Sequence, residues 1–236
     1  MALSDQEDNG QAETDEVAEE AIVEHIFEAI IEQRLPPGTK LSESALCEAF
    51  GVGRMRIRRS LLLLASREVV DLRANRGAFV ASPTAEQAAE IFEARLILEP
   101  DIARLAVQRA TDADLDMLTR HLEEEYEAHR QGRRNEAIRL SGQFHVHLCQ
   151  IAGNSVMLRM MKELVTRTSL IIGIYGAPGM VNCRDDDHAS IADAIRARDA
   201  DKASRMMRLH LKHIQEHLDL SSRKRPQLDL VTILKR

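Results

Sequence analysis

The sequence predicts a mainly α-helical protein. Aromatic residues make up only 3% of the 236 residues and Trp is absent, while Leu, Ala, Glu and Arg fill long stretches, a composition typical of helices rather than sheets. Apolar residues recur at three- and four-residue steps through most of the chain, which is the spacing of an amphipathic helix. Residues 69–80 depart from this pattern and predict two short strands around a turn.

The first third of the chain is predicted to fold as a winged helix-turn-helix. Its first amphipathic helix is ended by Leu35-Pro36-Pro37-Gly38, because proline cannot continue a helix and biases the preceding residue towards extended geometry. Ser42 is placed to cap a short second helix, and Gly51-Val52-Gly53 forms a tight turn into the third. The expected helices span 16–34, 43–50 and 54–67, and the two wing strands span 69–73 and 77–80.

The rest of the chain is predicted to form an antiparallel, all-helical bundle after the short linker Ala81-Ser82-Pro83. Thr84 and Gln87 have the spacing of a capping box, which marks the start of a helix. The expected helices span 84–109, 112–131, 134–152, 155–175, 185–198 and 200–219. The predicted organisation is a disordered acidic tail over 1–15, the winged domain over 16–82, the helical domain over 84–220 and a C-terminal tail over 221–236.

Arginine is concentrated around the turn and the third helix of the predicted winged domain. Between Gly51 and Arg76 there are seven Arg against two acidic residues, a local charge of +5 in a chain whose net charge is −6. An acidic protein that gathers arginine at one helix N-terminus and one glycine turn is arranged to meet phosphate groups there. The sequence therefore predicts a surface that binds double-stranded DNA.

Composition argues against other classes of protein. No apolar run approaches the roughly 18 residues that a membrane span requires, and no signal-peptide pattern opens the chain. Cys47, Cys149 and Cys183 are scattered without CxxC spacing, which indicates free thiols rather than a disulfide framework. We expect a protein of the reducing cytoplasm that has no membrane partner.

Three motifs, PGTKLSESAL, GVGRMRIRRSLLLL and NRGAFV, follow one another between Leu35 and Val80. Together they resemble the N-terminal domain of GntR-type bacterial transcription regulators. The helical half resembles the ligand-sensing domain of the FadR subgroup, with the markers Glu93-Ala94-Arg95, Leu98-Glu99, Phe144-His145, Gly153-Asn154, Asp187-His188, Ile191, Met207 and His210-Leu211. The resemblance covers about residues 20–220. It implies a regulator whose affinity for a DNA operator changes when a small metabolite binds the helical domain.

The resemblance also implies which residues contact DNA. Arg54 and Arg58 correspond to the recognition-helix arginines, and they lie one turn apart, where Arg can bind guanine O6 and N7 or clamp phosphate. Gly77 matches the wing-tip glycine, whose lack of a side chain lets the backbone approach the minor groove. Met55 and Arg56 replace the commoner Thr and Pro, so relatives' operator sequences are not expected to apply. The candidates are Arg54, Met55, Arg56, Arg58, Arg76 and Gly77, and the alternative is a solvated basic face.

Three histidines lie on apolar stripes of different predicted helices: His145, His188 and His210. A polar ring buried on an apolar face must find a partner, because leaving it unpaired costs free energy. For a single His the expected answer is a satisfied core residue. For three on converging helices a shared divalent metal is the stronger interpretation, since neutral imidazole is a common ligand of Zn and Ni.

Two residues beside the predicted metal site shape its expected chemistry. The resemblance implies an Asp four residues before the first histidine, and Ser141 stands there. We therefore expect weakened metal binding at a three-His site completed by water or effector, with loss of the metal as the alternative. Arg95 lies on an apolar stripe with Glu99 one turn on. It either holds the carboxylate of an acidic effector or pairs internally with Glu99.

Three classes of function are compatible with these features. The leading one is a non-enzymatic transcription regulator that responds to a small carboxylate. It is expected to be a homodimer, because two winged domains related by a two-fold axis can read a pseudo-palindrome. The first alternative is a metal-dependent hydrolase that uses the three histidines, although no general base is obvious on the same helix faces. The second is a structural nucleoid-binding protein, which leaves the buried His and Arg residues unexplained.

Overall fold

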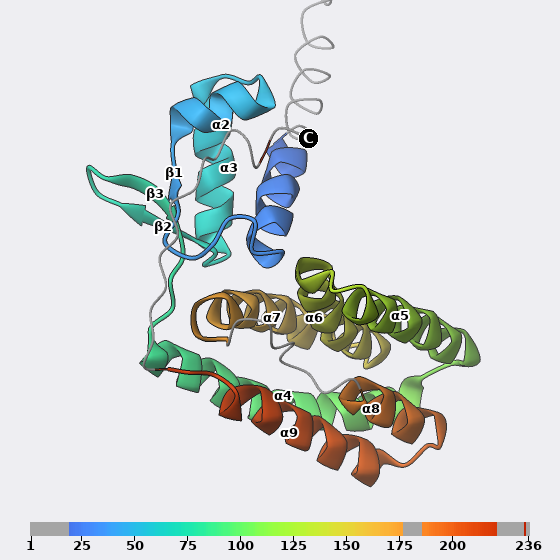
Figure 1. Ribbon diagram of the computed structural model, residues 1–236. Helices are drawn as coiled ribbons and strands as arrows, with labels where there is room; N and C mark the ends of the chain where they lie inside the picture. The colour runs from blue at the N-terminus through green and yellow to red at the C-terminus, as the bar shows by residue number, and fades with distance from the viewer. Residues whose placement is uncertain (1–18, 177–185, 221–233, 235–236) are drawn as a thin grey trace, which may run out of the picture. The chain divides into compact units, whose positions relative to one another are not determined.

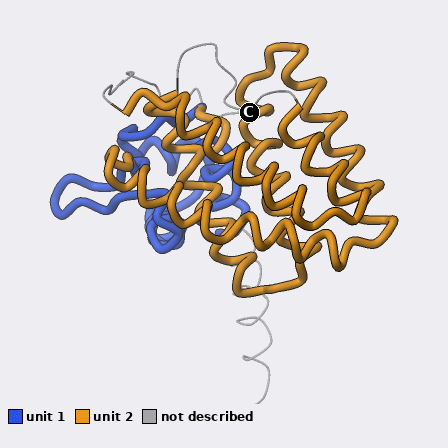
Figure 2. Tube along the Cα trace, turned by 90° about the horizontal axis from the view of Figure 1, so that it is seen from below, with its two compact units in different colours: residues 1–30, 34–81, 225–236 blue, residues 31–33, 82–224 orange. Residues whose placement is uncertain are grey.

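The computed structural model describes residues 19–176, 186–220 and 234, which divide into two compact units (Figures 1 and 2). Of these residues, the first unit holds 19–30, 34–81 and 234, and the second holds 31–33 and 82–220. The predicted tails over 1–15 and 221–236 lie outside the described residues, apart from 234. None of the described helices is long and apolar enough to cross a membrane.

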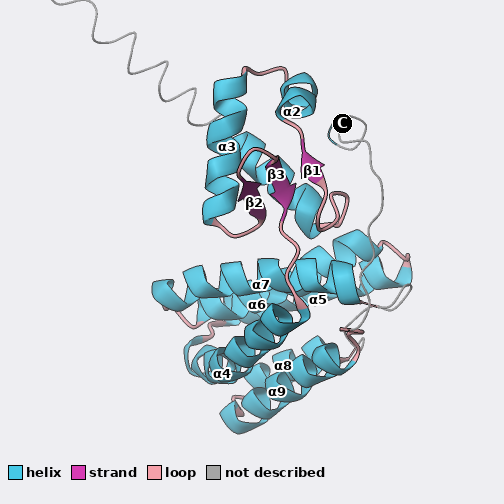
Figure 3. Cartoon of the chain, turned by 90° about the vertical axis from the view of Figure 1, so that its left-hand side faces the viewer, coloured by secondary structure: helices cyan, strands magenta, loops and turns pink. Residues whose placement is uncertain are grey.

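The first unit is a winged helix-turn-helix. After the helical residues 19–31 come β1 (Lys40–Leu41), α2 (Glu43–Phe50), α3 (Arg54–Ser66), β2 (Val70–Arg73) and β3 (Gly77–Val80). The strands form one antiparallel sheet in the order β1-β3-β2 (Figure 3). The helices and the sheet share one core, whose fully buried residues include Ile26, Leu46, Ile57, Leu64 and Val80. One face of α3 is held by this core, so its other face is left for solvent.

Apart from shifts of one residue at the end of α3 and the start of β2, three details of the first unit differ from the prediction. The first helix ends at residue 31 rather than 34, because Gln33 adopts a left-handed φ of 57° that a helix cannot continue. Ser42 occupies the N-cap position of α2, as predicted, but within the described residues its side chain does not bond to the helix N-terminus. Its hydroxyl instead contacts Ser44 Oγ at 2.9 Å. Strand β1 was not predicted, so the wing has three strands rather than two.

The second unit is a bundle of helices, as predicted. Its elements are α4 (Ala85–Arg109), α5 (Asp112–Arg130), α6 (Arg134–Ile151), α7 (Ser155–Tyr175), α8 (Asp187–Arg196) and α9 (Ala200–Glu216). Helix α4 packs along α9, α5 packs on α6, and α6 packs on α7 (Figure 1). Helix α8 contacts α4, α5 and α9, so α8 and α9 bring their side chains to the same interior as α4, α5 and α6.

Local chemistry sets where these helices begin and end. The capping box predicted for Thr84 and Gln87 is present, with both reciprocal hydrogen bonds, at 2.9 and 3.2 Å. Helix α8 stops before Arg198, which has a left-handed φ of 57°. Helix α9 ends at Glu216 rather than 219 because Leu218 forms an antiparallel bridge with Gly176.

Candidate metal centre and DNA-binding surface

The three histidines singled out from the sequence meet inside the second unit. His145 comes from α6, His188 from α8 and His210 from α9, and each is at most 3% exposed. Nε2 of His210 lies 3.1 Å from Nε2 of His188 and 3.3 Å from Nε2 of His145. The ligand atoms of all three rings lie within 4.8 Å of one another. Three separate helices thus aim imidazole nitrogens at one point.

The outer nitrogen of each ring faces a carboxylate. Nδ1 of His145 lies 2.5 Å from Glu99 Oε2. Nδ1 of His188 lies 2.9 Å from Glu125 Oε2, and Nδ1 of His210 lies 3.3 Å from Asp187 Oδ2. The contact between His145 and Glu99 is close, but its angles lie outside the range of a hydrogen bond. A carboxylate accepts an N–H, so it favours the proton on Nδ1 and leaves the lone pair of a neutral ring on Nε2. The inner nitrogens are therefore arranged as electron-pair donors.

Burial sets the charge of these groups. It lowers the pKa of His145 to about 4 and the pKa of His210 to about 3, so both rings are neutral at neutral pH. Burial opposes ionisation of Glu99, but the positive charge of Arg95, together with the contact to His145, outweighs it and holds the pKa of Glu99 below its ordinary range. The pKa of Glu125 is lowered in the same way, against burial, by its contacts with histidine. The centre thus combines the neutral rings of His145 and His210 with ionised carboxylates.

Glu125 was not singled out from the sequence. A signal for it exists, because Glu125 lies on the buried stripe of α5 together with Leu118, His121 and Ala128. A carboxylate at an apolar position of a helical repeat needs a buried partner. Asn154 occupies the N-cap position of α7, where its side chain accepts from the backbone N–H groups of Val156 and Met157.

Arg95 is buried beside the centre, where it has two protein partners. Its Nε donates to Glu99 and one terminal nitrogen donates to Thr168 Oγ1 at 3.1 Å. Of the two roles predicted for Arg95, the internal pair with Glu99 is therefore present. Arg95 also borders a cavity of about 30 Å³, together with Ser141, His145 and Thr168. A space of this size holds only about one or two water molecules, so a metabolite can enter only if helices move.

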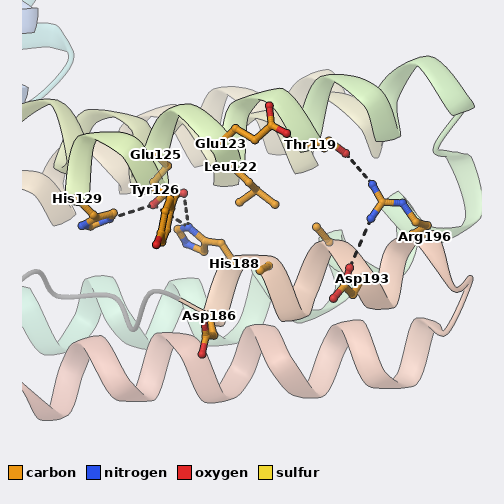
Figure 4. A pocket seen from close by; sticks show the side chains of 12 residues that line it. Thr119, Leu122, Glu123, Glu125, Tyr126, His129, Asp186, His188, Asp193 and Arg196 are labelled. Atoms are coloured by element: carbon orange, nitrogen blue, oxygen red, sulfur yellow. Dashed lines mark hydrogen bonds and ion pairs between the residues drawn. The ribbon is translucent and has the colours of Figure 1, made fainter. Parts of the chain in front are cut away.

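A larger cavity of about 330 Å³ lies between α5 and α8, with Glu125 and His188 in its wall (Figure 4). Its charged lining consists mainly of carboxylates, since it includes Glu123, Glu125, Asp186 and Asp193 but, among arginines and lysines, only Arg196. Arg196 is itself engaged by Thr119 at 2.6 Å and Asp193 at 3.5 Å (Figure 4). This lining disfavours an anionic ligand, although the volume suits a small molecule.

The six residues predicted to contact DNA fall into two groups in the first unit. Four belong to the first turn and a half of α3, and two lie at the turn between β2 and β3. All are exposed except Arg56, which is half-buried, and Met55 is 65% exposed despite being apolar. Gly77 has a φ of 91°, which favours glycine at the wing tip. Arg58 contacts Glu43, and the neighbouring Arg59 contacts Glu19 at 3.1 Å.

A winged helix-turn-helix with an exposed basic helix, followed by a helical domain that encloses a polar centre, defines a ligand-responsive DNA-binding transcription regulator. Comparison with known families agrees. Residues 18–80 match the family described as bacterial regulatory proteins, gntR family, and residues 90–213 match the FCD domain. The chain belongs to the GntR family, in the FadR subgroup, whose members carry the ligand-sensing FCD domain.

The chain is similar to several transcription regulators. The HTH-type transcriptional repressor RspR of Escherichia coli is 27% identical over 190 residues, which cover 79% of this chain and 82% of that protein. The Glc operon transcriptional activator of Escherichia coli is 27% identical over 223 residues, covering 84% and 88%. A GntR-type regulator from Rhodococcus sp. RHA1 shares the fold, with a TM-score of 0.73, 22% identity and coverage of 82% and 93%. These relatives are not enzymes, so the hydrolase alternative has no support.

Proposed function

We propose that this regulator holds one divalent metal ion, Zn or Ni, between His145, His188 and His210. The observation that carries the proposal is that the Nε2 atoms of the three rings converge, while the Nδ1 atom of each ring faces a carboxylate. Lone pairs that point at one another repel, and a cation between them turns that repulsion into attraction. Nitrogen ligands about 2.1 Å from a tetrahedral ion are about 3.4 Å apart, close to the 3.1 and 3.3 Å spacings of these rings.

Serine at position 141 sets the expected strength of this site. Ser141 lies one turn before His145 on α6 and borders the same small cavity. A neutral hydroxyl is a poorer ligand for Zn or Ni than a carboxylate. We therefore assign a three-His site whose remaining coordination is open, and whose affinity for metal is lower than in relatives with Asp at this position. A bound ion would act there as a Lewis acid towards an oxygen ligand.

We infer that the effector is a small carboxylate held between the metal site and Arg95. A guanidinium has five N–H donors, so its bonds to Glu99 and Thr168 leave donors for a ligand. The small cavity places Arg95 next to His145, whereas the larger cavity is lined mainly by carboxylates. Because the small cavity has room only for water, binding must push the surrounding helices apart. Such a change would shift the bundle between two packings and alter DNA affinity.

The DNA contacts are assigned to Arg54, Met55, Arg56, Arg58, Arg76 and Gly77, with the winged domain over 16–82 and the sensing domain over 84–220. A single winged domain offers a small interface, and two in a homodimer can read a pseudo-palindrome. We place the protein in the cytoplasm, where its operator is. Light scattering of the free and DNA-bound protein tests the dimer, and a monomer in both states would contradict it.

Metal content tests the central proposal. Elemental analysis and titration with Zn and Ni should give one ion per chain in the wild type and none in His210→Ala. Gel shifts with the protein's own upstream DNA, with and without candidate carboxylates, then report on the effector. If the wild type takes up no metal at micromolar concentration and His210→Ala still responds to effector, the three histidines are satisfied core residues and the metal is not part of the sensor.

A further inference from the structure

We propose that Glu43 is a positioning residue that holds the guanidinium of Arg58 for base reading and so contributes to operator specificity. The inference rests on the proposed contact of Arg58 with DNA. Glu43 is the first residue of α2 and Arg58 is the fifth residue of α3, so the contact links the two helices of the helix-turn-helix motif. None of the six residues proposed above to contact DNA is acidic.

The geometry of the contact leaves the reading end of Arg58 available. Nε of Arg58 donates to both carboxylate oxygens of Glu43, at 2.9 and 3.0 Å. An arginine carries one N–H on Nε and four on its two terminal nitrogens. Those terminal nitrogens form the fork that binds O6 and N7 of a guanine. Glu43 thus binds the guanidinium at Nε and leaves its two terminal nitrogens available for a base.

Two physical effects make this contact matter for specificity. The side chain of Arg58 is 58% exposed, and an exposed arginine samples many rotamers that it must give up on binding. A fixed guanidinium loses less conformational entropy when it meets its base. The second effect is electrostatic: the carboxylate of Glu43 is 36% exposed and repels phosphates of any sequence. The repulsion weakens all complexes, and a well-placed guanine contact compensates for it only at the operator.

An exposed ion pair of this kind contributes little to folding stability, so its removal should leave the winged domain folded. The chain also offers a matched control. Glu24 is a 61% exposed carboxylate of the same unit, 4.0 Å from Arg67 at the far end of α3. Glu24→Gln removes the same charge as Glu43→Gln without touching Arg58.

The test is selection of binding sites by the full-length protein from randomised duplex DNA, followed by sequencing. Arg58→Ala should lose the preference at one base pair of each half-site. Glu43→Ala should weaken preference at that same base pair by about tenfold, while its affinity for random DNA holds or rises. Glu43→Gln keeps an oxygen that accepts from Nε, so it should retain more of the preference than Glu43→Ala. Glu24→Gln should select the wild-type motif. Melting curves of each variant check that it is folded.

Two outcomes separate the inference from the proposal beneath it. If Arg58→Ala loses its base preference and Glu43→Ala keeps the wild-type motif, Glu43 does not position Arg58, and only this inference fails. If Arg58→Ala selects the wild-type motif, the proposed contact of Arg58 fails and the inference fails with it. The double variant gives a further check. The effect of Glu43→Ala should vanish in the Arg58→Ala background, and an undiminished effect there would show that Glu43 acts by another route.

Discussion

Nδ1 of His188 lies 2.9 Å from Oε2 of Glu125, and both side chains are almost completely buried. The carboxylate accepts the Nδ1–H and so selects the tautomer with a lone pair on Nε2. Phe144 stacks on the same ring, with centroids 4.3 Å apart and planes inclined by 23°. Contacts on an edge and on a face therefore hold His188 with Nε2 turned towards His210.

Removal of the charge at Glu125 should weaken metal binding. In Glu125→Gln an amide replaces the carboxylate, so the basicity of the His188 ring falls and its orientation is less strongly fixed. Loss of such a partner typically lowers metal affinity by about 10- to 100-fold. Competition with a chelator measures the change. Glu124→Gln is the control, because Glu124 is the exposed neighbour on the same helix. Equal affinities in the two variants would contradict the role of Glu125.

The metal-free protein should lose stability as the pH falls from about 6.5 towards 4. Burial lowers the pKa of His145 to about 4 and the pKa of His210 to about 3. In that window the unfolded chain binds more protons than the folded one, so stability rises with pH. Two such groups give a slope of up to about 2.7 kcal/mol per pH unit. The carboxylates of the centre, whose pKa values are lowered, act in the same direction below their ordinary pKa.

Urea unfolding in the presence of a chelator, at several pH values, measures this slope. Tyr fluorescence reports on the second unit, since both tyrosines of the chain, Tyr126 and Tyr175, belong to it. His210→Ala removes one of the two groups and should roughly halve the slope. A flat profile between about pH 5 and about pH 7 in the wild type would be evidence against neutral, buried rings.

Gly142→Ala should destabilise the helical domain. A Cβ at position 142 would lie 2.7 Å from Cγ1 of Val165, so α6 and α7 approach too closely for any side chain there. Valine on a helix has one strongly preferred rotamer and cannot easily turn away. Overpacking of this kind costs about 1–3 kcal/mol, which outweighs the roughly 1 kcal/mol that alanine gains in helix propensity.

Thermal melting measures the effect, and a second substitution tests its cause. In Val165→Ala the clashing methyl group is gone, so adding Gly142→Ala to that background should cost much less than it does in the wild type. An identical cost in both backgrounds would mean that the destabilisation has another origin.

The helices were predictable because their signals are local. Periodic apolar residues and turn residues such as Gly153 and Gly51 gave the bounds of α2 and α7 as the structure has them. Strand β1 was not predictable in this way. Its two residues, Lys40 and Leu41, form a strand only because they pair with Phe79 and Ala78 almost 40 positions later in the chain.

The same contrast holds within the candidate site. His145, His188 and His210 could be chosen from the sequence because each is a polar residue on an apolar stripe. The pattern of α5 indicates that Glu125 is buried, but its pairing with His188 depends on how α5 packs against α8, which no local pattern encodes. The local pattern also allowed Arg95 to pair with Glu99 on the same helix, but its contact with Thr168 depends on the packing of α4 against α7.

Ser141→Asp should strengthen the metal site. The substitution puts a carboxylate one turn before His145, on the wall of the cavity that Arg95 also borders. It adds a negatively charged oxygen ligand to three neutral nitrogens, so both the number of ligands and their attraction for a divalent cation increase. We expect the affinity for Zn to rise by roughly tenfold or more. Chelator competition on the wild type and the variant measures the gain.

Ser141→Asn separates the charge of the new ligand from its shape. Asparagine has nearly the same size as aspartate but a neutral amide oxygen, which Zn binds less well. Zn affinity should therefore be highest in Ser141→Asp and lower in Ser141→Asn. The wild type should have an affinity similar to that of Ser141→Asn. Because His210 supplies one of the three nitrogens, adding His210→Ala to Ser141→Asp should remove most of the gain. If Ser141→Asp binds Zn no better than Ser141→Asn, position 141 does not face the metal, and the three histidines must bind it without help from this turn of α6.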